Sequence, residues 1–88
     1  MKVIKIGAAW CNGCIVMKPR WADIEKEHPW LESEFYDYDE HPEVVDMYQV
    51  SGTLPVAIVF DDAGNEVARW NGEVAKDEIV QKLTSLRA

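Results

Sequence analysis

The feature that most constrains this chain is a pair of cysteines, Cys11 and Cys14, placed where the sequence pattern changes. Residues 3–6 form a short apolar run typical of a strand, and residues 11–26 carry apolar side chains at helical spacing. A disulfide between the two cysteines would close so short a loop that it would remove little entropy from the unfolded chain. The pair therefore indicates redox catalysis or metal binding rather than a structural cross-link.

The helix expected over residues 11–26 contains a proline. Its apolar positions follow three- and four-residue steps and so share one face: Cys14, Met17, Trp21 and Ile24. Pro19 removes a backbone hydrogen bond, which we expect to bend the helix without ending it. His28 precedes a second proline, and a residue in that position avoids the helical conformation, so the helix should end there.

The rest of the chain continues the alternation of strands and helices. We expect a strand over residues 34–39, a helix over 42–48, a loop over 51–53, a buried strand over 56–60, a turn over 61–65, a returning strand over 66–70 and a helix over 76–86. Val45 and either Tyr48 or Gln49 should mark the buried side of the short helix. The final helix carries one apolar stripe, formed by Ile79, Val80, Leu83 and Leu86.

This order, β-α-β-α-β-β-α, predicts an α/β fold with a four-stranded mixed sheet flanked by helices on both faces. The first three strands are joined through helices, which favours parallel crossovers, and the fourth follows a short turn and must be antiparallel. With 88 residues, the chain should form a single domain over residues 1–88.

The net charge of the chain limits the classes of binding partner that we expect. Asp and Glu number 16 against nine Lys and Arg, a net charge of −7. An acidic surface does not suit a nucleic acid backbone or an anionic membrane, so we expect neither as a partner. No apolar run is long enough to span a bilayer, and the N-terminal segment does not have the pattern of a signal peptide. Cytoplasmic residence is the expectation.

Four features carry a family resemblance. In chain order they are Trp10-Cys11-Asn12-Gly13-Cys14 after the first strand, Pro19 five residues beyond Cys14, Leu54-Pro55 before a buried strand, and Gly72 after the last strand. Together they resemble the thioredoxin superfamily, over nearly the whole chain. In length the chain is closer to the glutaredoxins and the small thioredoxin-like proteins, and it is expected to lack the first strand and helix of a typical thioredoxin. Glutaredoxins, however, usually carry C-P-Y-C without the preceding tryptophan.

The resemblance implies distinct roles for the two cysteines. Cys11, at a helix N-terminus where N–H groups stabilise an anion, would be the nucleophile. Cys14, expected one turn along on the buried side, would resolve the mixed disulfide. Electrons would travel in the redox-active Cys11–Cys14 disulfide, without a bound cofactor. A zinc half-site is the competing interpretation, but zinc takes four ligands and the two histidines, His28 and His41, lie far apart in the sequence.

The resemblance also implies a docking surface. The Leu54–Pro55 peptide bond should be cis, the Leu54 backbone should pair with a bound peptide, and Gly72 should lie close to the dithiol. Trp10 would add apolar surface around the sulfurs.

Two departures from the family pattern stand out. Asn12 and Gly13 replace the usual glycine and proline between the cysteines and should tune the redox potential. Lys5 stands where thioredoxins carry a buried acid. We expect Lys5 to pair with Asp37 or Asp39, to lie near Cys14 and lower its pKa, or to extend to water.

These observations predict a thioredoxin-like protein-disulfide reductase acting in electron transport and cell redox homeostasis. Its partners would be protein disulfides and an upstream donor similar to thioredoxin reductase, and a monomer suits that role. Two alternatives are a glutaredoxin-like reductase that uses glutathione and a thioredoxin-fold binding module without enzymatic activity.

Overall fold

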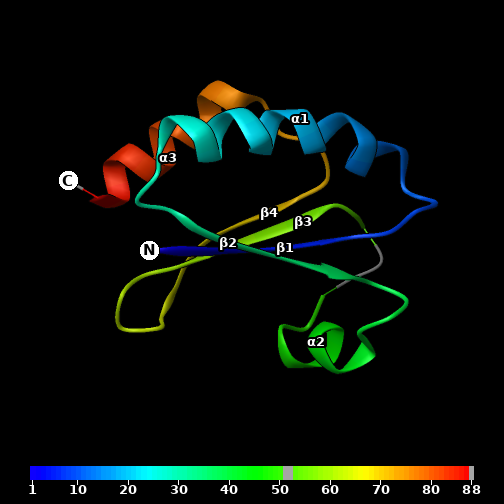
Figure 1. Cartoon of the computed structure of the whole chain (residues 1–88). Coiled ribbons are helices and arrows are strands. Elements are labelled where there is room, and N and C mark those ends of the chain that lie inside the picture. The colour runs from blue at the N-terminus through cyan, green and yellow to red at the C-terminus, as the bar shows by residue number, and fades with distance from the viewer. Residues whose placement is uncertain (51–52, 88) are drawn as a thin grey trace.

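The computed structural model describes residues 1–50 and 53–87. Along the chain the elements are β1 (Lys2–Gly7), α1 (Asn12–Glu27), β2 (Glu32–Asp37), α2 (Pro42–Met47), β3 (Val56–Phe60), β4 (Glu66–Asn71) and α3 (Lys76–Arg87). Helices α1 and α3 cover one face of the sheet, and α2 lies on the other face (Figure 1). The predicted element order and the four-stranded mixed sheet are confirmed. Of the predicted loop over 51–53, residues 51 and 52 lie outside the described residues.

The sheet order is β2-β1-β3-β4, and only the β1–β2 pair is parallel. The expectation that the third strand runs parallel to the first is wrong, because β3 is antiparallel to both β1 and β4. The six residues of α2 advance the chain by only about 9 Å, whereas a strand of that length is about 20 Å long. The chain therefore stays at the carboxyl end of β1, where Val56 pairs with Ile6, and β3 runs back from there.

Two local predictions are corrected. Strand β2 ends at Asp37 rather than Asp39, because the Asp37 carboxylate accepts the backbone N–H groups of Asp39 and Glu40, at 3.0 and 3.1 Å, and starts a turn. Of the positions expected on the buried side of the short helix, Val45 and Tyr48 are half-buried and pack against the core, whereas Gln49 is exposed with a φ of +52°; the most buried residue of α2 is Val44. Since α2 ends at Met47, the helical period does not extend as far as Gln49.

The core has two parts, one on each face of the sheet. Val3 of β1 packs among buried residues of α1 and α3, while Ile4 and Ile6 face the cluster beneath α2, as the alternation of a strand requires. The face toward α1 and α3 holds Val3, Met17, Trp21, Ile24, Leu31, Ala57, Val59, Val74, Ile79 and Leu83. Odd-numbered positions of β1 therefore project toward α1.

Helix α1 continues through Pro19 to Glu27, as predicted, and His28 caps its end with an N–H that donates to the Ile24 carbonyl at 2.9 Å. Pro19 has no N–H for the carbonyl of Ile15, a residue that lies exposed at the surface. Within residues 1–50 and 53–87, no helix is long and apolar enough to cross a membrane.

Candidate active site

Cys11 is the N-cap residue of α1. Its backbone is extended, with φ −94° and ψ 113°, and its Sγ accepts the backbone N–H of Cys14 at 3.2 Å. The Cys11 N–H in turn donates to the Ala8 carbonyl at 3.1 Å, which holds the turn between β1 and α1. The sulfur thus takes the place of a capping oxygen, in a position where the positive end of the helix dipole favours an anion.

Cys14 is less buried than we expected from the sequence. Cys11 is only 6% exposed, whereas Cys14 is half-buried and borders a cavity. Desolvation and a hydrogen bond with the Cys11 side chain raise the pKa of Cys14 from 9.0 to about 11, against the opposing effect of a hydrogen bond from the Ala8 backbone. The Cys14 thiol is therefore protonated at neutral pH.

Gly7 allows Cys14 to lie against β1, a contact that sequence reasoning missed. A Cβ atom added at Gly7 would lie 2.9 Å from Cys14 Sγ and 3.3 Å from Phe35 Cε2. The first distance is shorter than real Cβ contacts, so a side chain at position 7 would require Cys14 to move. The small residue at the end of β1 therefore determines where the Cys14 sulfur lies.

The Leu54–Pro55 peptide bond is cis, as expected from the sequence. Pro55 packs against the middle of the cysteine motif, since a Cβ atom added at Gly13 would lie 3.0 Å from Pro55 Cδ. The same added atom would lie 3.3 Å from Glu73 Cγ, a neighbour that the sequence did not indicate. The proline loop and the motif are therefore in direct contact, and Leu54 is half-buried beside them.

Gly72 joins this loop to the end of β4. Its N–H donates to the Pro55 carbonyl at 2.7 Å, and its φ of +87° lies in the left-handed region. An added Cβ atom would meet nothing within 4 Å. Glycine is thus favoured here by the backbone conformation and not by crowding.

Trp10 precedes Cys11 on the surface and is 59% exposed. Its Nε1–H donates to Asp39 Oδ2 at 2.7 Å, and its ring meets the Tyr38 ring edge-on at a centroid distance of 6.2 Å. Asp39, interpreted from the sequence as part of a solvated acidic face, therefore fixes the indole beside the cysteines. Asn12 is exposed in the first turn of α1.

The expected partners of Lys5 are wrong. Lys5 Nζ forms an ion pair with Glu25 Oε1 at 3.0 Å and lies 5.9 Å from the centre of the Trp21 ring. Position 5 projects toward α1, so the Lys5 side chain contacts that helix. The Asp37 carboxylate accepts the backbone N–H of Asp39, and the Asp39 carboxylate accepts the indole N–H of Trp10. Lys5 is also not among the groups that shift the pKa of Cys14, and that pKa is raised, not lowered.

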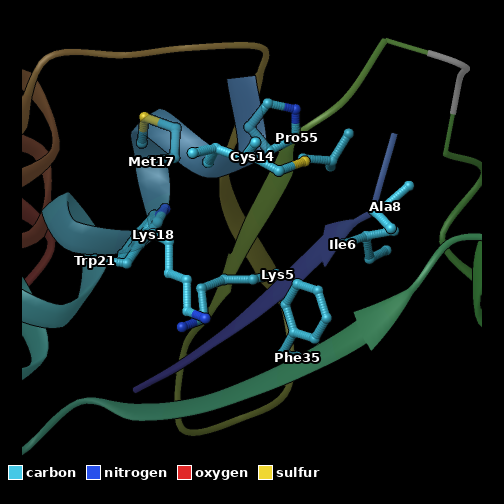
Figure 2. A pocket seen from close by; sticks show the side chains of 12 residues that line it. Lys5, Ile6, Ala8, Cys14, Met17, Lys18, Trp21, Phe35 and Pro55 are labelled. Atoms are coloured by element: carbon cyan, nitrogen blue, oxygen red, sulfur yellow. The ribbon is translucent and has the colours of Figure 1, made fainter. Parts of the chain in front are cut away.

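A cavity of about 380 Å³ opens beside Cys14, between α1 and the strands β1 and β2. Figure 2 shows Cys14 and Pro55 on one side of it and the side chains of Lys5 and Lys18 reaching toward the other. Phe35 of the edge strand β2 forms a wall. Neither Lys18 nor Phe35 stood out in the sequence, because the cavity depends on how three separate elements meet. Over residues 1–50 and 53–87, no group of three or more His, Cys, Asp or Glu residues is placed to hold a metal ion.

Comparisons with known proteins agree with this geometry. Residues 1–84 match the protein family described as thioredoxin. Thioredoxin C-3 of Corynebacterium nephridii is 27% identical over 81 residues, which are 92% of this chain and 54% of that protein. The chain thus spans about half the length of this curated relative.

Solved structures give the same fold. Fasciola hepatica thioredoxin superposes with a TM-score of 0.84 at 27% identity, covering 96% of this chain and 78% of that one. Trypanosoma brucei brucei thioredoxin superposes with a TM-score of 0.86 at 25% identity, covering 97% of this chain and 73% of that one. Thioredoxin 1 of Thermosipho africanus superposes with a TM-score of 0.85 at 23% identity, covering 98% of this chain and 93% of that one.

Proposed function

This chain belongs to the thioredoxin family, and from that premise we propose that it reduces protein disulfides through Cys11 and Cys14. Cys11 is the nucleophile and Cys14 the resolving thiol. The proposal rests chiefly on the asymmetry of the two sulfurs. Cys11 Sγ accepts a helix N–H at 3.2 Å, whereas burial and the Cys11 side chain hold the pKa of Cys14 at about 11. Only a thiolate attacks a disulfide, so Cys11 is the sulfur suited to react first.

The reaction proceeds in two exchanges. The Cys11 thiolate attacks one substrate sulfur, a mixed disulfide forms, and the other substrate sulfur leaves as a thiolate. Cys14 then gives up its proton and attacks Cys11 Sγ, which releases the second substrate sulfur and leaves the Cys11–Cys14 disulfide. Two electrons pass to the substrate, and an upstream reductase similar to thioredoxin reductase returns two electrons to the pair.

The surface around the motif supports docking of an extended substrate segment. The exposed Trp10 indole, held by Asp39, provides an apolar contact on one side of Cys11. Leu54 and cis Pro55 lie against Gly13 of the cysteine motif, where the Leu54 backbone would pair with the substrate chain. Gly72 acts on this surface through its hydrogen bond to the Pro55 carbonyl.

The test is reduction of insulin disulfides driven by NADPH and a thioredoxin reductase, with dithiothreitol as a second electron source. Cys11→Ser should lose activity with both. Cys14→Ser should also lose turnover but accumulate a mixed disulfide with the substrate, visible by mass spectrometry and cleaved by reductant. Trapping at Cys14 in the Cys11→Ser variant would overturn the assignment of roles.

Two further measurements separate the alternatives. A potential near or below about −230 mV in graded redox buffers fits a reductase, and one near about −180 to −120 mV fits an oxidant or isomerase. Faster turnover with glutathione and glutathione reductase than with thioredoxin reductase would favour glutathione-dependent chemistry. Partner binding that the Cys11→Ser/Cys14→Ser variant loses, without any redox activity in the parent protein, would favour a binding module.

A further inference from the structure

The cavity beside Cys14 differs in charge from the rest of the molecule. The chain as a whole has 16 acidic and nine basic residues. Among the described residues that line the cavity, two are lysines, Lys5 and Lys18, and none is acidic. The volume of about 380 Å³ falls within the range of small-molecule sites, which is about 300–1,000 Å³.

The two lysines differ in whether a carboxylate is already paired with the ammonium group. Lys5 is paired with Glu25 at 3.0 Å. Lys18, exposed on α1, has no hydrogen-bond or ion-pair partner among residues 1–50 and 53–87. Figure 2 shows both side chains extending toward the same side of the cavity, away from Pro55. The cavity therefore has one uncompensated positive charge at its rim.

Among residues 1–50 and 53–87, none that lines the cavity carries a negative charge to offset this one. Cys14 is a neutral thiol at neutral pH, since its pKa is about 11. Asp37 lies near enough for its charge to act on Cys14, but it is not among the residues lining the cavity, and its carboxylate is directed to two backbone N–H groups of the following turn. An anion at Lys18 would thus meet a thiol and not a thiolate.

The walls of the cavity are apolar and partly open to water. Ile15 on α1 is 67% exposed and Phe35 on β2 is 61% exposed, and the buried Trp21 and Met17 lie deeper. Apolar surface left in contact with water at the mouth of a concave site favours an apolar ligand that covers it. The cavity therefore combines an apolar body with the Lys18 ammonium group, which is unpaired among the described residues, while the Lys5 ammonium group is paired with Glu25.

We propose that this cavity binds a small amphipathic carboxylate, with its hydrocarbon portion against Phe35 and Ile15 and its carboxylate at Lys18. The proposal concerns equilibrium binding, so it holds or fails independently of the proposed reductase activity. Octanoate is a suitable probe because it carries one carboxylate on a short hydrocarbon chain.

The experiment is a titration of the ¹⁵N-labelled reduced protein with sodium octanoate, followed by NMR below the micelle concentration. We expect saturable shifts concentrated at residues that line the cavity. 1-Octanol is the neutral comparison, because it retains the hydrocarbon chain and lacks the charge. The Cys11→Ser variant, which lacks the nucleophile and whose residue 11 is not among those lining the cavity, should bind octanoate as the parent does, so loss of redox chemistry and loss of binding are scored separately.

Lys18→Met removes the cation and keeps an apolar stem of similar length. For a partly solvated ion pair, octanoate should bind about 5-fold more weakly to this variant, and octanol should bind as before. Lys26→Met is the matched control, since Lys26 is exposed on the same helix and is not among the residues lining the cavity. Added salt should weaken octanoate binding to the parent and leave octanol binding unchanged.

Phe35→Ser tests the apolar wall. It should weaken the binding of octanoate and octanol alike. Val16→Ser changes an exposed apolar residue of α1 that is not among those lining the cavity, and it should weaken the binding of neither. Absence of saturable shifts, shifts away from the cavity, or equal loss with Lys18→Met and Lys26→Met would overturn the proposal. An octanol affinity that falls with Lys18→Met as much as that of octanoate would also overturn it.

Discussion

Replacing Gly7 with alanine should perturb the site through a single contact. The added Cβ atom would lie 2.9 Å from Cys14 Sγ, 3.3 Å from Phe35 Cε2 and 3.5 Å from Cys14 Cβ. Phe35 is exposed and can turn away, but Cys14 is held at the start of α1, where its N–H donates to Cys11 Sγ. The strain therefore falls on the Cys14 sulfur.

The size of the effect follows from two opposing contributions. Inserting a methyl group into a packed site costs about 1–3 kcal/mol. Gly7 is a strand residue whose φ is not positive, so alanine fits its backbone and recovers about 0.4–1 kcal/mol by restricting the unfolded chain. The difference is about 0–2.6 kcal/mol, so we expect a net loss of about 1 kcal/mol, or about 4–8 °C in Tm for a domain of this size.

Urea unfolding of the reduced protein measures this loss, and a double-mutant cycle assigns it. In a Cys14→Ala background the 2.9 Å contact is gone, so Gly7→Ala should cost close to zero or stabilise slightly. A cost that is equal in both backgrounds would refute the assignment of the strain to the Cys14 sulfur.

Three further predictions concern neighbouring groups. The pKa of Cys14 in the folded protein, about 11, lies above its ordinary value of 9.0, so the reduced protein should lose stability as the pH rises through this interval. Midpoints of urea unfolding, measured at several pH values, should show that the Cys14→Ser variant loses less stability over the same interval. Gly72→Ala should lower stability by about 1 kcal/mol in urea unfolding because of its φ of +87°, and no loss would contradict the left-handed conformation. Lys5→Met should leave the pKa of Cys14 unchanged in a thiolate absorbance titration while lowering stability by at most about 1 kcal/mol, since it breaks only the partly exposed pair with Glu25; a raised pKa would show that the Lys5 charge acts on Cys14 and would contradict this.

The features that the sequence predicted correctly are set by local chemistry. The apolar period along residues 14–24 placed Met17, Trp21 and Ile24 on the buried side of α1. The position of Leu54-Pro55 before a buried strand, together with the cysteine motif, pointed to the cis peptide bond. In each case the information lies within a few residues or in a family pattern.

The features that were missed depend on where separate segments lie in space. The direction of β3 was wrong because a helix between two strands suggests a crossover, and nothing local shows that α2 is too short to return the chain. The partner of Lys5 was wrong because the neighbouring strand was considered and the facing helix, which carries Glu25, was not. The cavity was missed because Lys18 and Phe35 meet only after α1 packs on β1 and β2.

The high pKa of Cys14 bears on the order of steps in the proposed mechanism. A thiol with a pKa of about 11 is a poor nucleophile at neutral pH, yet the resolving step requires its thiolate. Two of the causes that raise this pKa come from Cys11, namely the side-chain hydrogen bond and the charge of its sulfur. Both are lost once Cys11 Sγ is bonded to a substrate sulfur, while the hydrogen bond from the Ala8 backbone, which favours the thiolate, remains. Desolvation, the largest cause of the raised pKa, remains in the mixed disulfide, so we expect the loss of the two Cys11 contributions to lower the pKa of Cys14 only part of the way and to make it a better nucleophile after Cys11 has reacted.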